Sequence, residues 1–123
     1  MNTGGQTAEG FANQAKTFAT KLFAKKNDVK LVIVSSMLPN TEGKNDGTVQ
    51  YQEEALKPVV KALQDAGHTV ELAPLQSVHK VLDSVKRFRE TSGNNMNHPG
   101  DYLHRIYAQV ALETICGYSK DYK

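Results

Sequence analysis

The feature that most constrains the fold is a short, almost unbroken aliphatic run at residues 29–34, Val-Lys-Leu-Val-Ile-Val. Aliphatic and β-branched residues at consecutive positions are typical of a strand that is covered on both faces, as in a parallel sheet. An alternating run at residues 69–73, closed by Pro74, predicts a second strand. We therefore expect an α/β fold in which the first strand lies centrally in the sheet.

Two helices are predicted around the first strand by apolar residues spaced three and four apart. Residues 7–26 have the pattern of an amphipathic helix. A second helix is expected to end at Gly67, because glycine readily adopts the backbone conformation that closes a helix. Its regular part should begin near Lys57, since Pro58 lacks the N–H group that a helix interior uses.

Two further helices are predicted after the second strand. Residues 78–88 show helical periodicity, with Ser77 as the expected N-cap. A polar loop over residues 91–100 precedes a last helix, which Asp101 is expected to cap and which should end near Gly117. A sheet of only two parallel strands is a poor core, so the strand at residues 29–34 needs a further partner.

Length and composition favour one small domain over residues 1–123, with 39% apolar residues and a formal charge of +2. The basic residues are scattered, so no nucleic-acid partner is predicted. No run approaches the roughly 20 apolar residues of a membrane span. The start of the chain lacks the features of a signal peptide, so a cytoplasmic location is expected if Met1 is the natural start. The single cysteine, Cys116, is interpreted as a buried small residue, and no metal or organic cofactor is predicted.

The most informative stretch for function is Asn-Asn-Met-Asn-His-Pro-Gly-Asp at residues 94–101. It places His98 in a loop directly before a helix, where an imidazole can take and return a proton near neutral pH. That is the chemistry of a hydrolase base. His98 and Pro99, followed by an apolar helix, resemble the last conserved block of the SGNH (GDSL-type) hydrolases, whose catalytic histidine is commonly followed by proline.

The resemblance covers essentially the whole chain but only about the C-terminal half of the family domain. Met1-Asn2-Thr3-Gly4 resembles the end of the family's third block, Gly-x-Asn-Asp, and the strands and helices follow in the family's order. The resemblance implies a flavodoxin-like, three-layer α/β/α fold with a parallel sheet, truncated here to about two strands and four helices. It also implies hydrolysis of a small carboxylic ester by the intact enzyme.

The resemblance further implies a role for each of three residues. His98 would be the general base and acid, and Asn2 would donate a hydrogen bond to the oxyanion. Asn95 stands where the family has the aspartate that orients the histidine, so its amide or a backbone carbonyl would take that role. No serine lies in a Gly-Asp-Ser-type turn, so the nucleophile is expected upstream and the chain alone is expected to be inactive.

Two other residues, Asn45 and His104, are rivals for these roles. Asn45, in Gly-Lys-Asn-Asp at residues 43–46, matches the third block literally, but it lies one strand too late and is better explained as a turn residue. His104 has the Asp-x-x-His spacing with Asp101, but both would lie in the first turn of a helix, so His98 is preferred. His68 and His79 have no metal-ligand spacing, and either a surface or a hydrogen-bonded core position explains them.

A function from another class is also consistent with the sequence. The chain could be a non-catalytic α/β module whose exposed sheet edge pairs with another protein. A second copy of the chain, or a missing N-terminal segment, is the expected partner at that edge.

Overall fold

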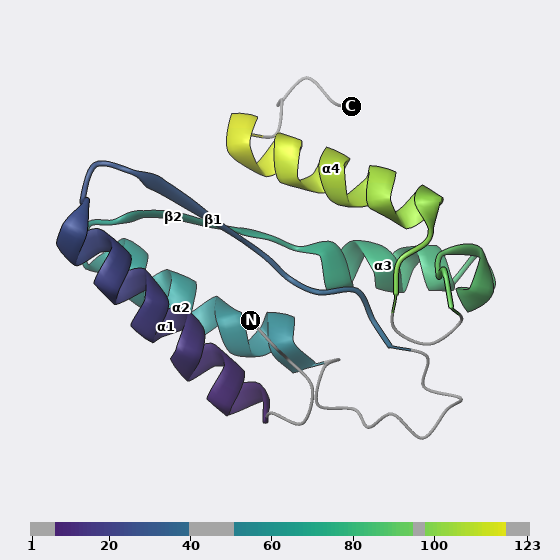
Figure 1. Ribbon diagram of the computed structural model, residues 1–123, viewed down its shortest axis with the longest axis horizontal. Helices are drawn as coiled ribbons and strands as arrows, with labels where there is room; N and C mark the ends of the chain where they lie inside the picture. The colour runs from purple at the N-terminus through teal and green to yellow at the C-terminus, as the bar shows by residue number, and fades with distance from the viewer. Residues whose placement is uncertain (1–6, 40–50, 95–97, 118–123) are drawn as a thin grey trace.

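Two parallel strands form the centre of the fold, and the computed structural model describes residues 7–39, 51–94 and 98–117 (Figure 1). These residues form a mixed α/β structure with four α-helices and one two-stranded sheet. In chain order the elements are α1 (Ala8–Lys25), β1 (Lys30–Val34), α2 (Gln52–Asp65), β2 (Thr69–Ala73), α3 (Leu75–Asp83), the 3-10 helix η2 (Phe88–Glu90) and α4 (Asp101–Cys116). The predicted order of helices and strands is confirmed.

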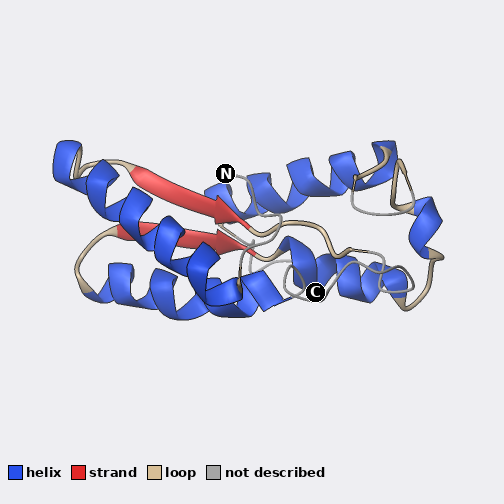
Figure 2. Ribbon diagram, turned by 60° about the horizontal axis from the view of Figure 1, so that its bottom comes forward, coloured by secondary structure: helices blue, strands red, loops and turns tan. Residues whose placement is uncertain are grey.

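The strands run side by side in the same direction, paired from Lys30 with Thr69 to Val34 with Ala73 (Figure 2). The Ser35 N–H extends this ladder by donating to the Ala73 carbonyl at 3.2 Å. Because backbone groups alternate in direction along a strand, the N–H groups of Val32 and Val34 point away from β2. Within the described ranges no third strand lies on that outer edge, so β1 is an edge strand here rather than the central strand we expected.

Helices cover both faces of the sheet, which accounts for the aliphatic sequence of β1 (Figure 1). Leu31 and Ile33 pack against α1 and α2, together with buried residues such as Phe23 and Leu63. Val32 points to the other face and packs in a second cluster that contains Leu103 of α4. No helix in the described part of the chain is long and apolar enough to cross a membrane.

The start of α2 differs from the prediction. The helix begins at Gln52 rather than near Lys57, and Pro58 lies inside it. Pro58 has no N–H group to donate to the Glu54 carbonyl one turn earlier. Both residues are exposed, so water can bind that carbonyl instead. The helix ends at Asp65, and Gly67, just beyond the C-cap residue Ala66, has a φ of 91°, the conformation for which glycine was expected at this helix end.

Two predicted N-caps and one predicted burial are also wrong. α3 begins at Leu75, so Ser77 lies within its first turn, and the helix ends at Asp83. Gly100, rather than Asp101, is the N-cap of α4. Cys116 closes α4 on its exposed side instead of being buried, because the side that packs on the sheet carries Leu103 and Val110.

Candidate functional site

A pocket lies at the carboxyl ends of both strands, which is where open parallel sheets bind ligands. Its volume is about 350 Å³. The residues that line it come from the segment after β1 and from the starts of α2 and α3: Leu38, Tyr51, Glu53, Glu54, Gln76, Ser77 and Lys80. Two other described pockets lie on the outer surface of α1, away from the strand ends. The pocket at the strand ends is therefore the best-placed candidate site.

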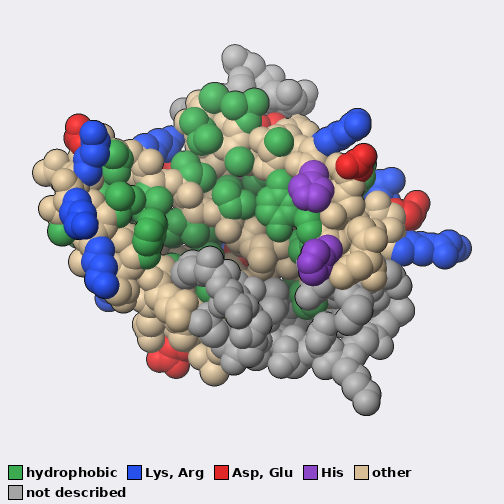
Figure 3. All heavy atoms as spheres, in the orientation of Figure 1, with side chains coloured by type: hydrophobic (Ala, Val, Ile, Leu, Met, Phe, Trp, Pro, Cys, Tyr) green, Lys and Arg blue, Asp and Glu red, His purple; other side chains and the backbone are tan. Residues whose placement is uncertain are grey.

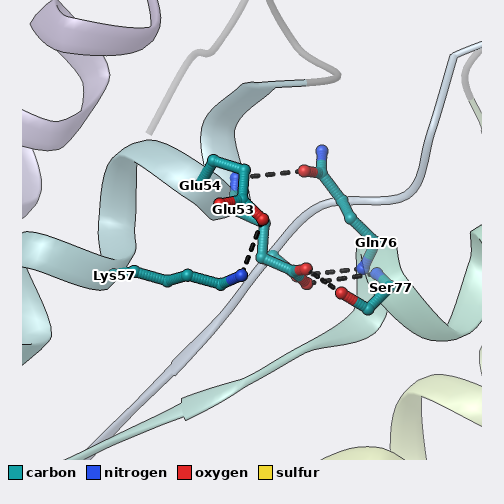
Figure 4. Close-up of polar contacts among 6 residues, drawn as sticks. Glu53, Glu54, Lys57, Gln76 and Ser77 are labelled. Atoms are coloured by element: carbon teal, nitrogen blue, oxygen red, sulfur yellow. Dashed lines mark hydrogen bonds and ion pairs between the residues drawn. The ribbon is translucent and has the colours of Figure 1, made fainter.

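Glu53 is the buried acidic group of this pocket, with only 3% of its surface exposed. Its Oε1 atom accepts a hydrogen bond from the Ser35 hydroxyl at 2.7 Å and from the Ser77 N–H at 3.3 Å. Its Oε2 atom accepts from the Ser77 hydroxyl (Figure 4). A buried carboxylate is costly unless donors surround it, and these three donors meet that need.

The first turns of α2 and α3 cap each other. The Glu53 N–H donates to the Gln76 side-chain carbonyl at 3.0 Å, while the Glu53 carboxylate accepts from the Ser77 N–H (Figure 4). First-turn N–H groups have no partner within their own helix, so each helix here receives its acceptor from the other. We call this pair of contacts the reciprocal cap. It fixes the two helix ends that form the floor of the pocket.

The serines near the pocket are hydrogen-bonded to residues at the starts of α2 and α3. The Ser35 side chain is fully buried and also accepts from the Gln76 N–H at 3.0 Å. The Ser36 hydroxyl donates to the side-chain carbonyl of Gln52 at 2.9 Å. Within the described residues no serine hydroxyl is hydrogen-bonded to a histidine ring, so no Ser-His pair forms there.

His79 occupies a fully buried position in α3. Its Nδ1 atom accepts from the Leu38 N–H at 2.9 Å, which places the proton of the neutral ring on Nε2. That Nε2–H donates to the Thr91 hydroxyl at 2.9 Å, and Thr91 in turn donates to the Phe88 carbonyl at 2.8 Å. His79 is therefore a hydrogen-bonded core histidine, one of the two explanations that the sequence left open.

This burial makes the stability of the protein depend on pH. Desolvation lowers the pKa of His79, and the nearby carboxylate of Asp83, 3.4 Å from Nε2, opposes the shift only in part. The unfolded chain, with a histidine pKa near 6.5, then binds a proton more readily than the folded one. We expect the free energy of unfolding to be unaffected by His79 above about pH 6.5 and to fall below it, by at most about 1.4 kcal/mol per pH unit.

Urea unfolding at about pH 7.5 and about pH 5.5, above and below the ordinary histidine pKa of about 6.5, measures this effect. His79→Asn keeps an acceptor for the Leu38 N–H but cannot titrate, so it should lose stability at both pH values and show a smaller difference between them. The exposed His104 provides the matched variant, His104→Asn, which should keep the full difference. Equal pH differences in all three proteins would contradict the assignment to His79.

His98 lies at the exposed base of the loop before α4. An isolated antiparallel bridge between Ser92 and Pro99 closes that loop, and the Gly93 N–H donates to the His98 carbonyl at 2.7 Å. The His98 ring contacts the side chain of Asn94, with 3.0 Å between the Asn94 Nδ2 and the ring Nδ1. His98 does not line the described pocket at the strand ends.

The other predicted site residues have different outcomes. Asn2, Asn95 and the rival Asn45 lie outside the described residues, so their roles stay predictions. The rival His104 is exposed in the first turn of α4, with its Nδ1 3.0 Å from the Gly100 carbonyl. Since a carbonyl only accepts, His104 carries its proton on Nδ1.

The sequence did not identify Glu53, Gln76 and Ser77 as residues of a pocket, although Ser77 was expected to be an N-cap. Acidic and polar residues at helix starts are usually solvated, so nothing in the sequence sets these three apart. The described residues contain no group of three potential metal ligands. Comparisons with protein-family models, curated proteins and solved structures found no match to this chain.

Proposed function

We propose that this chain is the C-terminal part of a serine ester hydrolase of the SGNH (GDSL) type. The observation that carries the proposal is the open edge of β1 in a parallel sheet whose two faces are already covered by helices. Such a sheet is the expected end piece of a flavodoxin-like, three-layer domain. Strands supplied from upstream of Met1 would pair with the N–H groups of Val32 and Val34 and would bring the nucleophile.

In the complete enzyme the chain would contribute the proton transfers. A serine from the upstream segment attacks the ester carbonyl while His98 accepts its proton, and His98 then returns that proton to the departing alcohol. Water repeats the sequence on the acyl-enzyme and releases the acid. Asn2 donates to the oxyanion, and Asn95 or a backbone carbonyl accepts from the imidazole.

A second candidate function is supported by the exposed apolar side chains. Phe18, Val81 and Val85 are 59%, 66% and 78% exposed. The face drawn in Figure 3 has hydrophobic side chains across its middle and lysine and arginine toward its two ends. An open strand edge and exposed apolar side chains are each suited to binding another chain, so a non-catalytic interaction module is the alternative.

One pair of proteins tests both functions: the 123-residue chain and a longer one that carries the in-frame sequence upstream of Met1. We expect the short chain to self-associate through β1 in sedimentation and to show no burst of acyl-enzyme with an activated ester. The longer protein should be monomeric and should hydrolyse that ester. A longer protein without hydrolysis would favour the interaction module.

The edge itself is tested with two substitutions at one position. Val34→Pro removes an N–H that points away from β2, so it should weaken self-association without removing a bond between β1 and β2. Val34→Thr keeps that N–H and should associate like the unmodified chain. A short chain that is monomeric at all concentrations would exclude pairing through this edge.

A further inference from the structure

We propose that Asn94 is a positioning residue that sets which nitrogen of His98 carries the proton, and that it holds His98 in the Nε2–H form. As a statement about catalysis this rests on the proposed function, but the tautomer itself is a property of the 123-residue chain. The contacts between Asn94 and His98 carry the inference.

The orientation of the Asn94 amide follows from the backbone of His98. The His98 N–H lies 3.0 Å from the Asn94 Oδ1 atom, and only an oxygen can accept at that place. The amide nitrogen is thereby turned toward the ring, where Nδ2 lies 3.0 Å from the His98 Nδ1. An amide nitrogen can only donate, so Nδ1 must be the acceptor and the neutral ring must carry its proton on Nε2.

This tautomer is the opposite of the one that a triad-type base uses. In a Ser-His-Asp arrangement, the Nδ1–H is held by an acceptor and the lone pair on Nε2 takes the serine proton. Asn94 presents a donor to Nδ1, so Nε2 of His98 becomes a base only after that contact changes. His104 offers the contrast within the same chain, because the Gly100 carbonyl holds it as the Nδ1–H form.

The substitution that tests the inference is Asn94→Asp, which changes one donor group into an acceptor at nearly constant shape. The carboxylate can still accept from the His98 N–H, and its second oxygen now faces the ring. We expect His98 to switch to the Nδ1–H form. Asn94→Ala removes the donor without adding an acceptor, so it should give a mixture of both forms.

Nitrogen-15 NMR of the ring atoms at about pH 9, well above the ordinary histidine pKa of roughly 6.5, reads the tautomer directly. The unmodified chain should show a protonated Nε2 and an unprotonated Nδ1 in His98, and Asn94→Asp should exchange them. The signals of His104 should keep the Nδ1–H pattern throughout. An Nδ1–H form of His98 in the unmodified chain, or no exchange in Asn94→Asp, would overturn the inference.

Asn13→Asp is the matched control for the added charge, since Asn13 is an exposed asparagine on α1. It should leave the His98 tautomer unchanged, and an exchange there would mean that Asn94 is not the cause. In the longer protein, Asn94→Asp should raise kcat for the activated ester at least tenfold with little change in KM. If the tautomer exchanges but the longer protein hydrolyses no ester, the proposed function fails and the role of Asn94 in setting the tautomer stands.

Discussion

Replacing His98 with alanine in the longer, ester-hydrolysing protein is expected to lower kcat/KM by roughly 10⁴-fold or more. In the proposed mechanism the imidazole moves the proton in both halves of the reaction, and a nucleophile without its base loses nearly all of its reactivity. Steady-state hydrolysis of an activated short-chain ester measures the loss. His98 is exposed, so the variant should fold like the unmodified protein.

His104→Ala is the matched control for this experiment, because His104 is an exposed histidine only six positions away. We expect it to retain activity within a few fold. Asn2→Ala should cost roughly 100-fold if its amide donates to the oxyanion. Asn95→Asp should be neutral or faster, because it supplies a charged partner for the imidazole. A large loss in His104→Ala with none in His98→Ala would reverse the assignment of the base.

Replacing Glu53 with alanine is expected to lower the free energy of unfolding by about 3 kcal/mol. The change removes the closer acceptor of the buried Ser35 hydroxyl, which keeps only its 3.3 Å contact with the Ala73 carbonyl. It also removes the acceptor of the Ser77 N–H and leaves a cavity between α2 and α3. Lost or weakened hydrogen bonds at a buried site, together with the cavity, account for a loss of this size. Urea unfolding at fixed protein concentration measures the effect, since self-association would otherwise change the apparent stability.

Glu54→Ala is the control, because Glu54 is the exposed neighbour whose ion pair with Lys57 lies in solvent (Figure 4). Exposed pairs of this kind contribute little, so we expect a change below about 1 kcal/mol. Glu53→Gln, which keeps one acceptor oxygen, should fall between the two. Equal effects at both positions would show that the contacts of Glu53 do not stabilise the fold.

The regular elements were predictable because their apolar periodicity is local information. The helix at Ala8–Lys25 and the strands at Lys30–Val34 and Thr69–Ala73 agree with the sequence to within about two residues. The apolar residues of α1 keep a helical period, β1 is a short and nearly continuous aliphatic run, and β2 alternates. Parallel pairing was also predictable from the aliphatic run, because strands covered on both faces occur mainly in parallel sheets.

The helix starts were predicted less well because contacts between helices determine them. Ser77 has the side chain of an N-cap, but its hydroxyl binds Glu53 while the helix begins two residues earlier. Pro58 predicted a late start for α2, yet the first turn is retained by the bonds that Glu53 makes to α3. Neither contact can be anticipated from local propensity, because the partners are more than 20 positions apart.

The candidate site, too, was predictable only in part. His98 was placed correctly in a loop before the last helix, because proline and glycine after a histidine mark such a boundary. Its contact with Asn94 could not be predicted, since an exposed asparagine has many possible partners. The pocket at the strand ends was also not foreseen, because it depends on three segments that meet only in the folded chain.

The reciprocal cap has a consequence for motion at the pocket. Helix ends normally fray, since their last hydrogen bonds open at little cost and independently of the core. Here the first turn of α2 cannot open without also releasing the first turn of α3, because Glu53 of α2 donates to the Gln76 side chain and accepts from the Ser77 N–H, both in α3. The pocket floor is thus held in one shape before any ligand arrives, and binding there would require little of the ordering that usually weakens affinity.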